Sequence, residues 1–134
     1  MKRLLATLGL LALFLGAPAS AAPGNPVLYL IGTEASVAGG LSWTRYRLAV
    51  LNKDVYPADL FAPAPDLPPC GANPNSSRAW VDIFDSRGKR LYGFCALRSP
   101  ADLDKLWFAL EAGAVPPSYV YIEIHDRRTG TKYR

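Results

Sequence analysis

Ala79, Val81 and Ile83 alternate with Trp80, Asp82 and Phe84, a period of two in the first of two neighbouring segments, 78–84 and 90–97. This period is typical of strands whose two faces differ. The tetrapeptide from Asp85 to Gly88 lies between the two segments and has the composition of a tight turn, with a glycine free to adopt positive φ. The pattern predicts a β-hairpin with strands over 78–84 and 90–97.

Five further segments are predicted to be strands, at 27–31, 43–51, 55–62, 119–125 and 131–134. In the second of them, the alternate positions Thr44, Tyr46, Leu48 and Val50 form the expected core face. Pro57 confines the segment 55–62 to an edge or an irregular strand. Residues 32–40 are small and polar, and we expect a connection there.

One helix is predicted after the hairpin. Ser99 is a candidate N-cap, Pro100 suits the first helical position and Asp102 completes a capping-box-like pair. Apolar side chains then recur at helical spacing until Gly113 ends the run, at Leu103, Leu106, Trp107 and Leu110. We expect this stripe in the core, which favours Trp107 as a packing residue over a sugar-stacking one.

These elements predict a mainly β chain, an antiparallel β-sandwich with one helix packed between strands; an α+β arrangement is the alternative. A sandwich alternates its connections between two ends. The turns after the segments 43–51, 78–84 and 119–125 are therefore expected to share one end.

The first 21 residues have the three parts of a signal peptide. Lys2 and Arg3 precede an apolar run over 4–15, and small residues follow at 19–21. The run is shorter than the ~20 residues that a membrane span needs. Loss of Lys2 and Arg3 would lower the formal net charge from +4 by two, to +2, which argues against a nucleic-acid binder. The sequence predicts a secreted or periplasmic protein with a single domain over 27–134 and no membrane span.

The two cysteines, Cys70 and Cys95, are predicted to form a disulfide, as expected of two thiols in an exported chain. Closing a loop of roughly 25 residues would contribute on the order of 3 kcal/mol. Cys70 lies in a proline-rich segment from Pro63 to Ser77, which predicts a long, rigid loop.

Candidate catalytic groups are few. His125 is the sole histidine, and its use with Cys95 as a thiol catalyst would require an unpaired cysteine. Four carboxylates lie on predicted strands and turns, and no spacing singles out a pair for glycoside chemistry; they are Asp82, Asp85, Glu123 and Asp126. No phosphate loop, cofactor fingerprint or metal motif is present. The sequence therefore predicts no catalytic residues, no cofactor and no metal.

Basic residues gather at three predicted turns, and we expect them to form a ligand-binding patch if the turns converge. They are Lys53, Arg87, Lys89, Arg127 and Arg128. Such a tip would attract an anionic protein or polysaccharide. The alternative is that these charges only keep the turns soluble. No feature of the sequence indicates an oligomeric state.

The succession of about seven strands resembles immunoglobulin-like and fibronectin type III domains. Trp80 followed by the segment 88–91 is similar to the third-strand region of immunoglobulin domains, and Tyr119 or Tyr121 matches the place of a tyrosine corner. The cysteines depart from that family, because Cys95 lies outside the strand 119–125. The segments 67–71, 80–83 and 93–97 are also similar to uncharacterised exported bacterial domains, which imply no function.

Together these features predict an exported, non-catalytic binding module. Two alternatives stay open: a small secreted hydrolase, and a protease inhibitor that presents the loop from Pro63 to Ser77.

Overall fold

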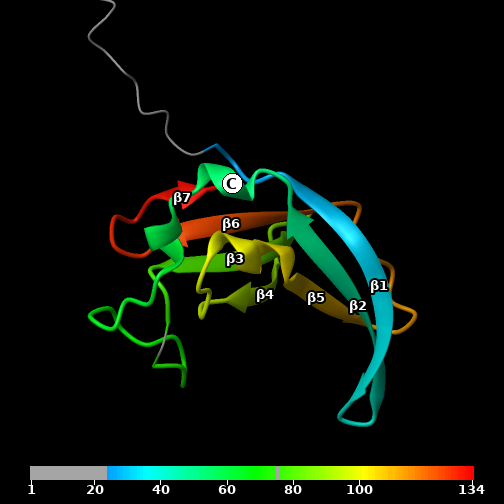
Figure 1. Ribbon diagram of the computed structural model, residues 1–134. Helices are drawn as coiled ribbons and strands as arrows, with labels where there is room; N and C mark the ends of the chain where they lie inside the picture. Colours follow the sequence, from blue (N-terminus) through cyan, green and yellow to red (C-terminus); the bar gives the residue numbers. More distant parts are fainter. Residues whose placement is uncertain (1–23, 75) are drawn as a thin grey trace, which may run out of the picture.

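The computed structural model describes residues 24–74 and 76–134, and these residues form two antiparallel β-sheets (Figure 1). The predicted signal peptide lies outside them. The first sheet has the order β1-β2-β5, with strands Leu28–Ala38, Leu41–Val50 and Leu106–Glu111. The second has the order β4-β3-β6-β7, with strands Arg90–Phe94, Ala79–Asp85, Val120–Asp126 and Lys132–Tyr133. Three short 3₁₀ turns complete the described elements: η1 (Lys53–Val55), η2 (Ala58–Phe61) and η3 (Pro100–Asp104).

The predicted hairpin is confirmed as β3 and β4, although β4 ends at Phe94 and not at residue 97. Asp85 organises its turn, because Asp85 Oδ1 accepts hydrogen bonds from the backbone N–H groups of Arg87 (2.9 Å) and Lys89 (2.8 Å). Gly88 has a φ of 83°, the left-handed conformation that a side chain would disfavour. The local sequence thus determines both the strands and their connection.

β1 is longer than the strand predicted at 27–31, and it forms a hairpin with β2. Residues 32–38 were expected in a connection, yet β1 continues through them to Ala38 and pairs with β2 along its length. Gly39 and Gly40 make the turn, with φ of 60° and 79°. Two consecutive positive φ angles define the two-residue turn that suits the twist of a hairpin. Small residues at 33–38 are compatible with a strand once β2 supplies the hydrogen-bonding partners.

The predicted helix is wrong. Only its first turn is helical, as η3, where Asp102 Oδ2 accepts the backbone N–H groups of Arg98 (2.6 Å) and Ser99 (3.2 Å). The chain then extends into β5, which pairs with β2. Leu106 and Leu110 satisfy a period of two as well as the helical one. As a strand, this segment pairs with the backbone N–H and C=O groups along the edge of β2, which a helix would leave without partners.

The predicted strand at residues 55–62 is also wrong. Its place is taken by η1 and η2, separated by Pro57, which lacks the N–H that a strand ladder needs. Leu60 and Phe61 from η2 are nevertheless buried, at 2% and 0% exposure. Tyr56 is buried between the two turns and donates its hydroxyl to Gly24 O (2.7 Å). Burial raises the pKa of Tyr56 to about 12.

Side chains from both sheets and from η2 and η3 form a continuous hydrophobic core. Its members are Leu48, Val50, Tyr56, Leu60, Phe61, Ala79, Val81, Ile83, Leu97, Leu103, Leu106, Phe108, Ile122 and Ile124. The expected core face of the segment 43–51 is confirmed at Leu48 and Val50, and Tyr46 stacks on Phe108 with ring centroids 4.9 Å apart. Trp107 lies on the other face of β5, half-buried between Arg45 and Tyr92.

The predicted disulfide between Cys70 and Cys95 is present, with Cα atoms 6.1 Å apart. It joins the loop from Pro63 to Ser77 to the segment after β4. A backbone bridge between Pro63 and Ser77 closes the base of the loop. None of the helical segments in residues 24–74 and 76–134 is long and apolar enough to cross a membrane.

Candidate functional site

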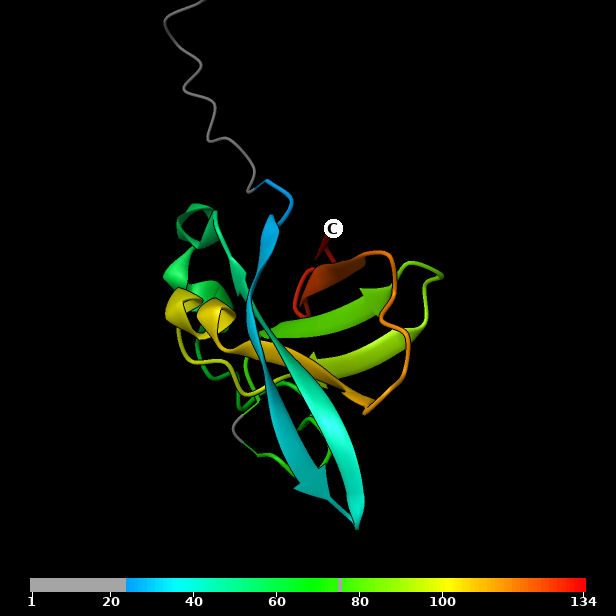
Figure 2. The same ribbon diagram turned by 90° about the vertical axis from the view of Figure 1, so that its right-hand side faces the viewer.

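The predicted convergence of the basic turns is wrong. β3 and β6 are antiparallel neighbours, with Ala79 opposite Asp126 and Asp85 opposite Val120. The turn that carries Arg87 and Lys89 therefore lies at one end of this sheet, and the turn after Asp126 lies at the other (Figure 2). The expectation assumed that alternate connections share an end and that a helix follows the segment 90–97. β5 takes the place of that helix, so β6 runs antiparallel to β3 and its following turn lies at the opposite end.

The five predicted binding residues have different surroundings. Lys53 Nζ lies 3.0 Å from Asp104 Oδ2, and Arg128 forms a double contact with Asp66, with Nη1–Oδ2 at 2.7 Å. Arg128 thus connects the β6–β7 turn to the proline-rich loop.

Arg127 lies beside Arg128 and has a different role. It donates hydrogen bonds to the backbone carbonyl oxygens of Ser77 (3.0 Å) and Pro68. At the other end of the sheet, Arg87 and Lys89 line a depression of about 540 Å³ together with residues of the segment 115–118. The five predicted binding residues therefore lie in separate places and do not form one patch.

A different group of polar residues meets on the outward face of the second sheet. In β3, Val81 and Ile83 point into the core, so Trp80 and Asp82 lie on the opposite face. In β6 the same alternation places Glu123 and His125 outward, and Asp82 is directly opposite Glu123. The pattern was visible in the sequence, but the pairing of β3 with β6 was not.

Asp82 is held by neighbours from two strands. Its Oδ1 accepts hydrogen bonds from Trp80 Nε1 (2.9 Å) and Arg90 Nε (2.7 Å). Gly93 lies opposite Asp82, and a Cβ there would collide with the Arg90 guanidinium. These contacts fix the Trp80 indole and neutralise a carboxylate whose residue is only 8% exposed.

Glu123 is the most buried acid of this face, at 3% exposure. The Arg134 guanidinium donates to Glu123 Oε2, and Lys132 Nζ lies 3.8 Å from Oε1. His125 Nε2 lies 2.8 Å from the same Oε1 and 3.5 Å from Asp82 Oδ2, but it forms no aligned hydrogen bond with either. His125 thus stands between two carboxylates that already have cationic partners.

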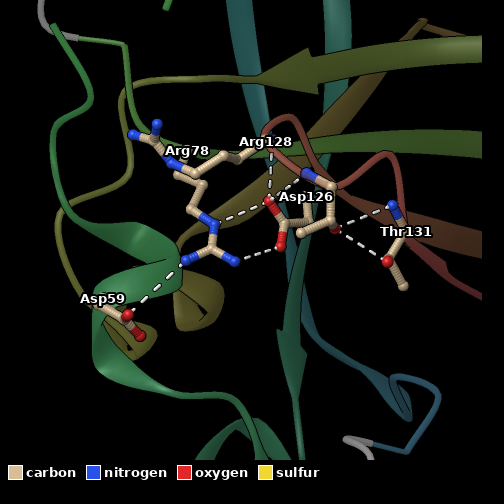
Figure 3. Close-up of polar contacts among 6 residues, drawn as sticks. Asp59, Arg78, Asp126, Arg128 and Thr131 are labelled. Carbon is tan, nitrogen blue, oxygen red and sulfur yellow. Dashed lines mark hydrogen bonds and ion pairs between the residues drawn. The ribbon is translucent and has the colours of Figure 1, made fainter. Parts of the chain in front are cut away.

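Asp126 is the last residue of β6, on the same side of the strand as Ile124 (Figure 3). Its carboxylate accepts two hydrogen bonds from Arg78, with Nη2–Oδ2 at 2.6 Å and Nε–Oδ1 at 2.8 Å, and one from the backbone N–H of Arg128. Its own backbone N–H donates to Thr131 O. The Arg78 guanidinium, foremost among these partners, lowers the pKa of Asp126 to about 2. Asp126 is therefore fully ionised and paired at neutral pH.

These side chains surround a pocket of about 460 Å³ above the outward face. It is lined by Pro68, Trp80, Asp82, His125, Asp126, Arg127, Gly130 and Lys132. The volume falls in the range of small-ligand sites. Of the predicted binding residues, only Arg127 lines this pocket. We call it the outward pocket.

The sequence offers two kinds of candidate catalytic group, a Cys95–His125 thiol catalyst and a pair of carboxylates. Cys95 is in the predicted disulfide, so it offers no thiol for catalysis with His125. The carboxylates of Asp82, Glu123 and Asp126 each contact an arginine. Within residues 24–74 and 76–134, no group of three or more potential ligands is arranged to hold a metal ion.

Comparison with known proteins gave no relatives. No protein-family model, no curated protein and no solved structure matches this chain.

Proposed function

We propose that this protein is an exported β-sandwich module that binds an acidic polysaccharide through the outward pocket. Export rests on the leader pattern of residues 1–21, and the Cys70–Cys95 disulfide suits an oxidising compartment. Two antiparallel sheets over one core are the arrangement that a sandwich requires.

The observation that carries the proposal is an excess of positive charge around the pocket. Its two lining acids, Asp82 and Asp126, are each paired with an arginine. Arg127 donates hydrogen bonds to two backbone carbonyl oxygens. These acceptors carry no net charge, so they do not neutralise the guanidinium. Lys132 contacts Glu123 only at 3.8 Å, and Arg134 already contacts that acid. A carboxylate or sulfate group on a ligand would neutralise this excess positive charge.

Trp80 favours a sugar as the body of that ligand. Its indole lines the pocket and is held by the hydrogen bond to Asp82, so little side-chain freedom remains to be lost on binding. A flat indole packs against the C–H face of a pyranose, while the neighbouring cations contact its acidic group. Binding through such exposed charges should weaken as salt screens them.

Affinity electrophoresis in gels containing polygalacturonate tests the proposal, with dextran as the neutral polymer. We expect retardation only in the acidic gel, and less of it as salt increases. Lys132→Ser should weaken binding about tenfold, corresponding to about 1.4 kcal/mol. Lys89→Ser is the matched control, because it removes the same charge at the opposite end of the sheet. It should leave the retardation unchanged.

A second pair of variants tests the indole. Trp80→Phe keeps a flat ring in the pocket, whereas Trp80→Leu does not, and both lose the hydrogen bond to Asp82. We expect Trp80→Phe to bind more tightly than Trp80→Leu at equal stability. Equal losses for Lys132→Ser and Lys89→Ser, or no retardation of the unmodified protein, would refute the proposal.

A further inference from the structure

The hairpin of β1 and β2 extends away from the rest of the molecule, as Figures 1 and 2 show from two sides. Within the described part of the chain, β1 has a single strand neighbour, β2, so its other edge is free. Eight of the eleven residues of β1 are exposed, including Val37 at 76%. A long free edge with exposed apolar side chains is a surface on which another strand can pair.

The hydrogen bonds around β2 identify which residues of β1 face that edge. Leu51 N donates to Val27 O, and Ala112 N donates to Ser42 O. Odd-numbered residues of β2 therefore face β1, and even-numbered residues face β5. Since Glu34 is opposite Arg45 and Ser36 is opposite Trp43, these two residues face β2. Thr33, Ala35 and Val37 direct their backbone N–H and C=O groups to the free edge.

We propose that this edge pairs with the same edge of a second copy, antiparallel and centred on Ala35. In that register Ala35 is opposite Ala35 of the second copy, and Thr33 is opposite Val37. Each of these three pairs can exchange two backbone hydrogen bonds. The result is one continuous sheet with the order β5-β2-β1-β1-β2-β5.

Charge favours a second copy as the occupant. Glu34 is the sole charged residue of β1, which lacks the lysines and prolines that block edge pairing in other proteins. In the proposed register each Glu34 is opposite Ser36 of the other copy, whose hydroxyl can donate to the carboxylate. Glu34 Oε1 also lies 3.6 Å from Arg45 Nη1 of its own chain. The pairing therefore brings no like charges directly opposite each other. The proposed pairing of two β1 edges does not depend on the binding of an acidic polysaccharide.

Cysteine cross-linking tests the register. At a two-fold axis through Ala35, the two Cα atoms would be about 5.5 Å apart, which is within the range for a disulfide. Ala35→Cys should form a covalent dimer under mild oxidation, located by peptide mapping because Cys70 and Cys95 are already bonded. Thr33→Cys is the control, since the two residues at that position would be about 14 Å apart.

Light scattering tests the unmodified protein, which should have twice the mass of the monomer at high concentration. Ala35→Pro should return it to a monomer with the same thermal unfolding midpoint, because the lost N–H faces the free edge. If the unmodified protein stays monomeric at several hundred micromolar, or if Thr33→Cys cross-links as readily as Ala35→Cys, the inference is wrong.

Discussion

Gly93 lies directly opposite Asp82 across the β3–β4 pair, and its missing side chain leaves the space through which Arg90 reaches the Asp82 carboxylate. A Cβ at residue 93 would lie 2.6 Å from Asp82 Oδ1 and would also collide with the guanidinium. The contact between Arg90 and Asp82 therefore needs a residue without a side chain at position 93.

Gly93→Ala should therefore destabilise the fold by about 1–2 kcal/mol, because the flexible Arg90 side chain can move aside but the buried Asp82 carboxylate then loses this charged partner. Urea unfolding measures the change. Gly32→Ala is the matched control in the other sheet, where a Cβ would meet nothing within 4 Å. It should change the free energy of unfolding by less than about 1 kcal/mol. Equal effects of the two substitutions would show that Arg90 and Asp82 can move apart at no cost.

The Arg78–Asp126 pair should make stability depend on acid pH. The pKa of Asp126 is about 2 in the folded protein, below its ordinary 3.8. The stabilisation is therefore complete above about pH 4 and is lost as the pH falls toward 2. Asp126→Asn should lower the free energy of unfolding at neutral pH by about 2 kcal/mol. The difference from the unmodified protein should shrink in acid.

Asp59→Asn is the control for that experiment. Asp59 Oδ2 lies 3.6 Å from Arg78 Nη1, but its side chain is 74% exposed, and such surface pairs contribute little. We expect an unchanged pH profile for Asp59→Asn. If Asp126→Asn also leaves the profile unchanged, another group dominates the acid transition.

Local patterns in the sequence predicted the elements whose partners are also local. The β3–β4 hairpin depends on alternation and on the turn from Asp85 to Gly88, and it was predicted correctly. Residues 106–110 are apolar throughout, so this segment satisfied both a helical and an extended period. Only its distant partner β2 decides between them. Propensity and spacing do not contain that information.

The candidate site shows the same limit. Trp80 and Asp82 were assigned to one face of a strand, and Glu123 and His125 follow from alternation in the segment 119–125. Their meeting depends on β6 pairing with β3, 35 or more residues away in the chain. The basic turns were placed together on an assumed order of strands, and the order β4-β3-β6-β7 separates them.

The predicted core stripe can be tested at Leu106, which is 1% exposed on β5. Leu106→Ala should lower the free energy of unfolding by about 2–5 kcal/mol, because it leaves a cavity between the sheets. Leu51→Ala is the control, since Leu51 is 62% exposed. Its effect should stay within about 0.5 kcal/mol. A loss below that value for Leu106→Ala would mean that β5 does not pack on the core.

The disulfide should stabilise the whole fold, and its local effect should be largest at residues 70–74 beside Cys70. Cys70 and Cys95 close a loop of 25 residues, and opening it should cost on the order of 3 kcal/mol through the unfolded chain. A thiol titration of the denatured, unreduced protein should find no free sulfhydryl. In the double variant Cys70→Ser/Cys95→Ser, the proline-rich loop keeps the contacts of Arg127 with Pro68 and of Arg128 with Asp66. Hydrogen exchange should therefore increase more at residues 70–74 than at the β6–β7 turn, and a uniform increase would contradict this.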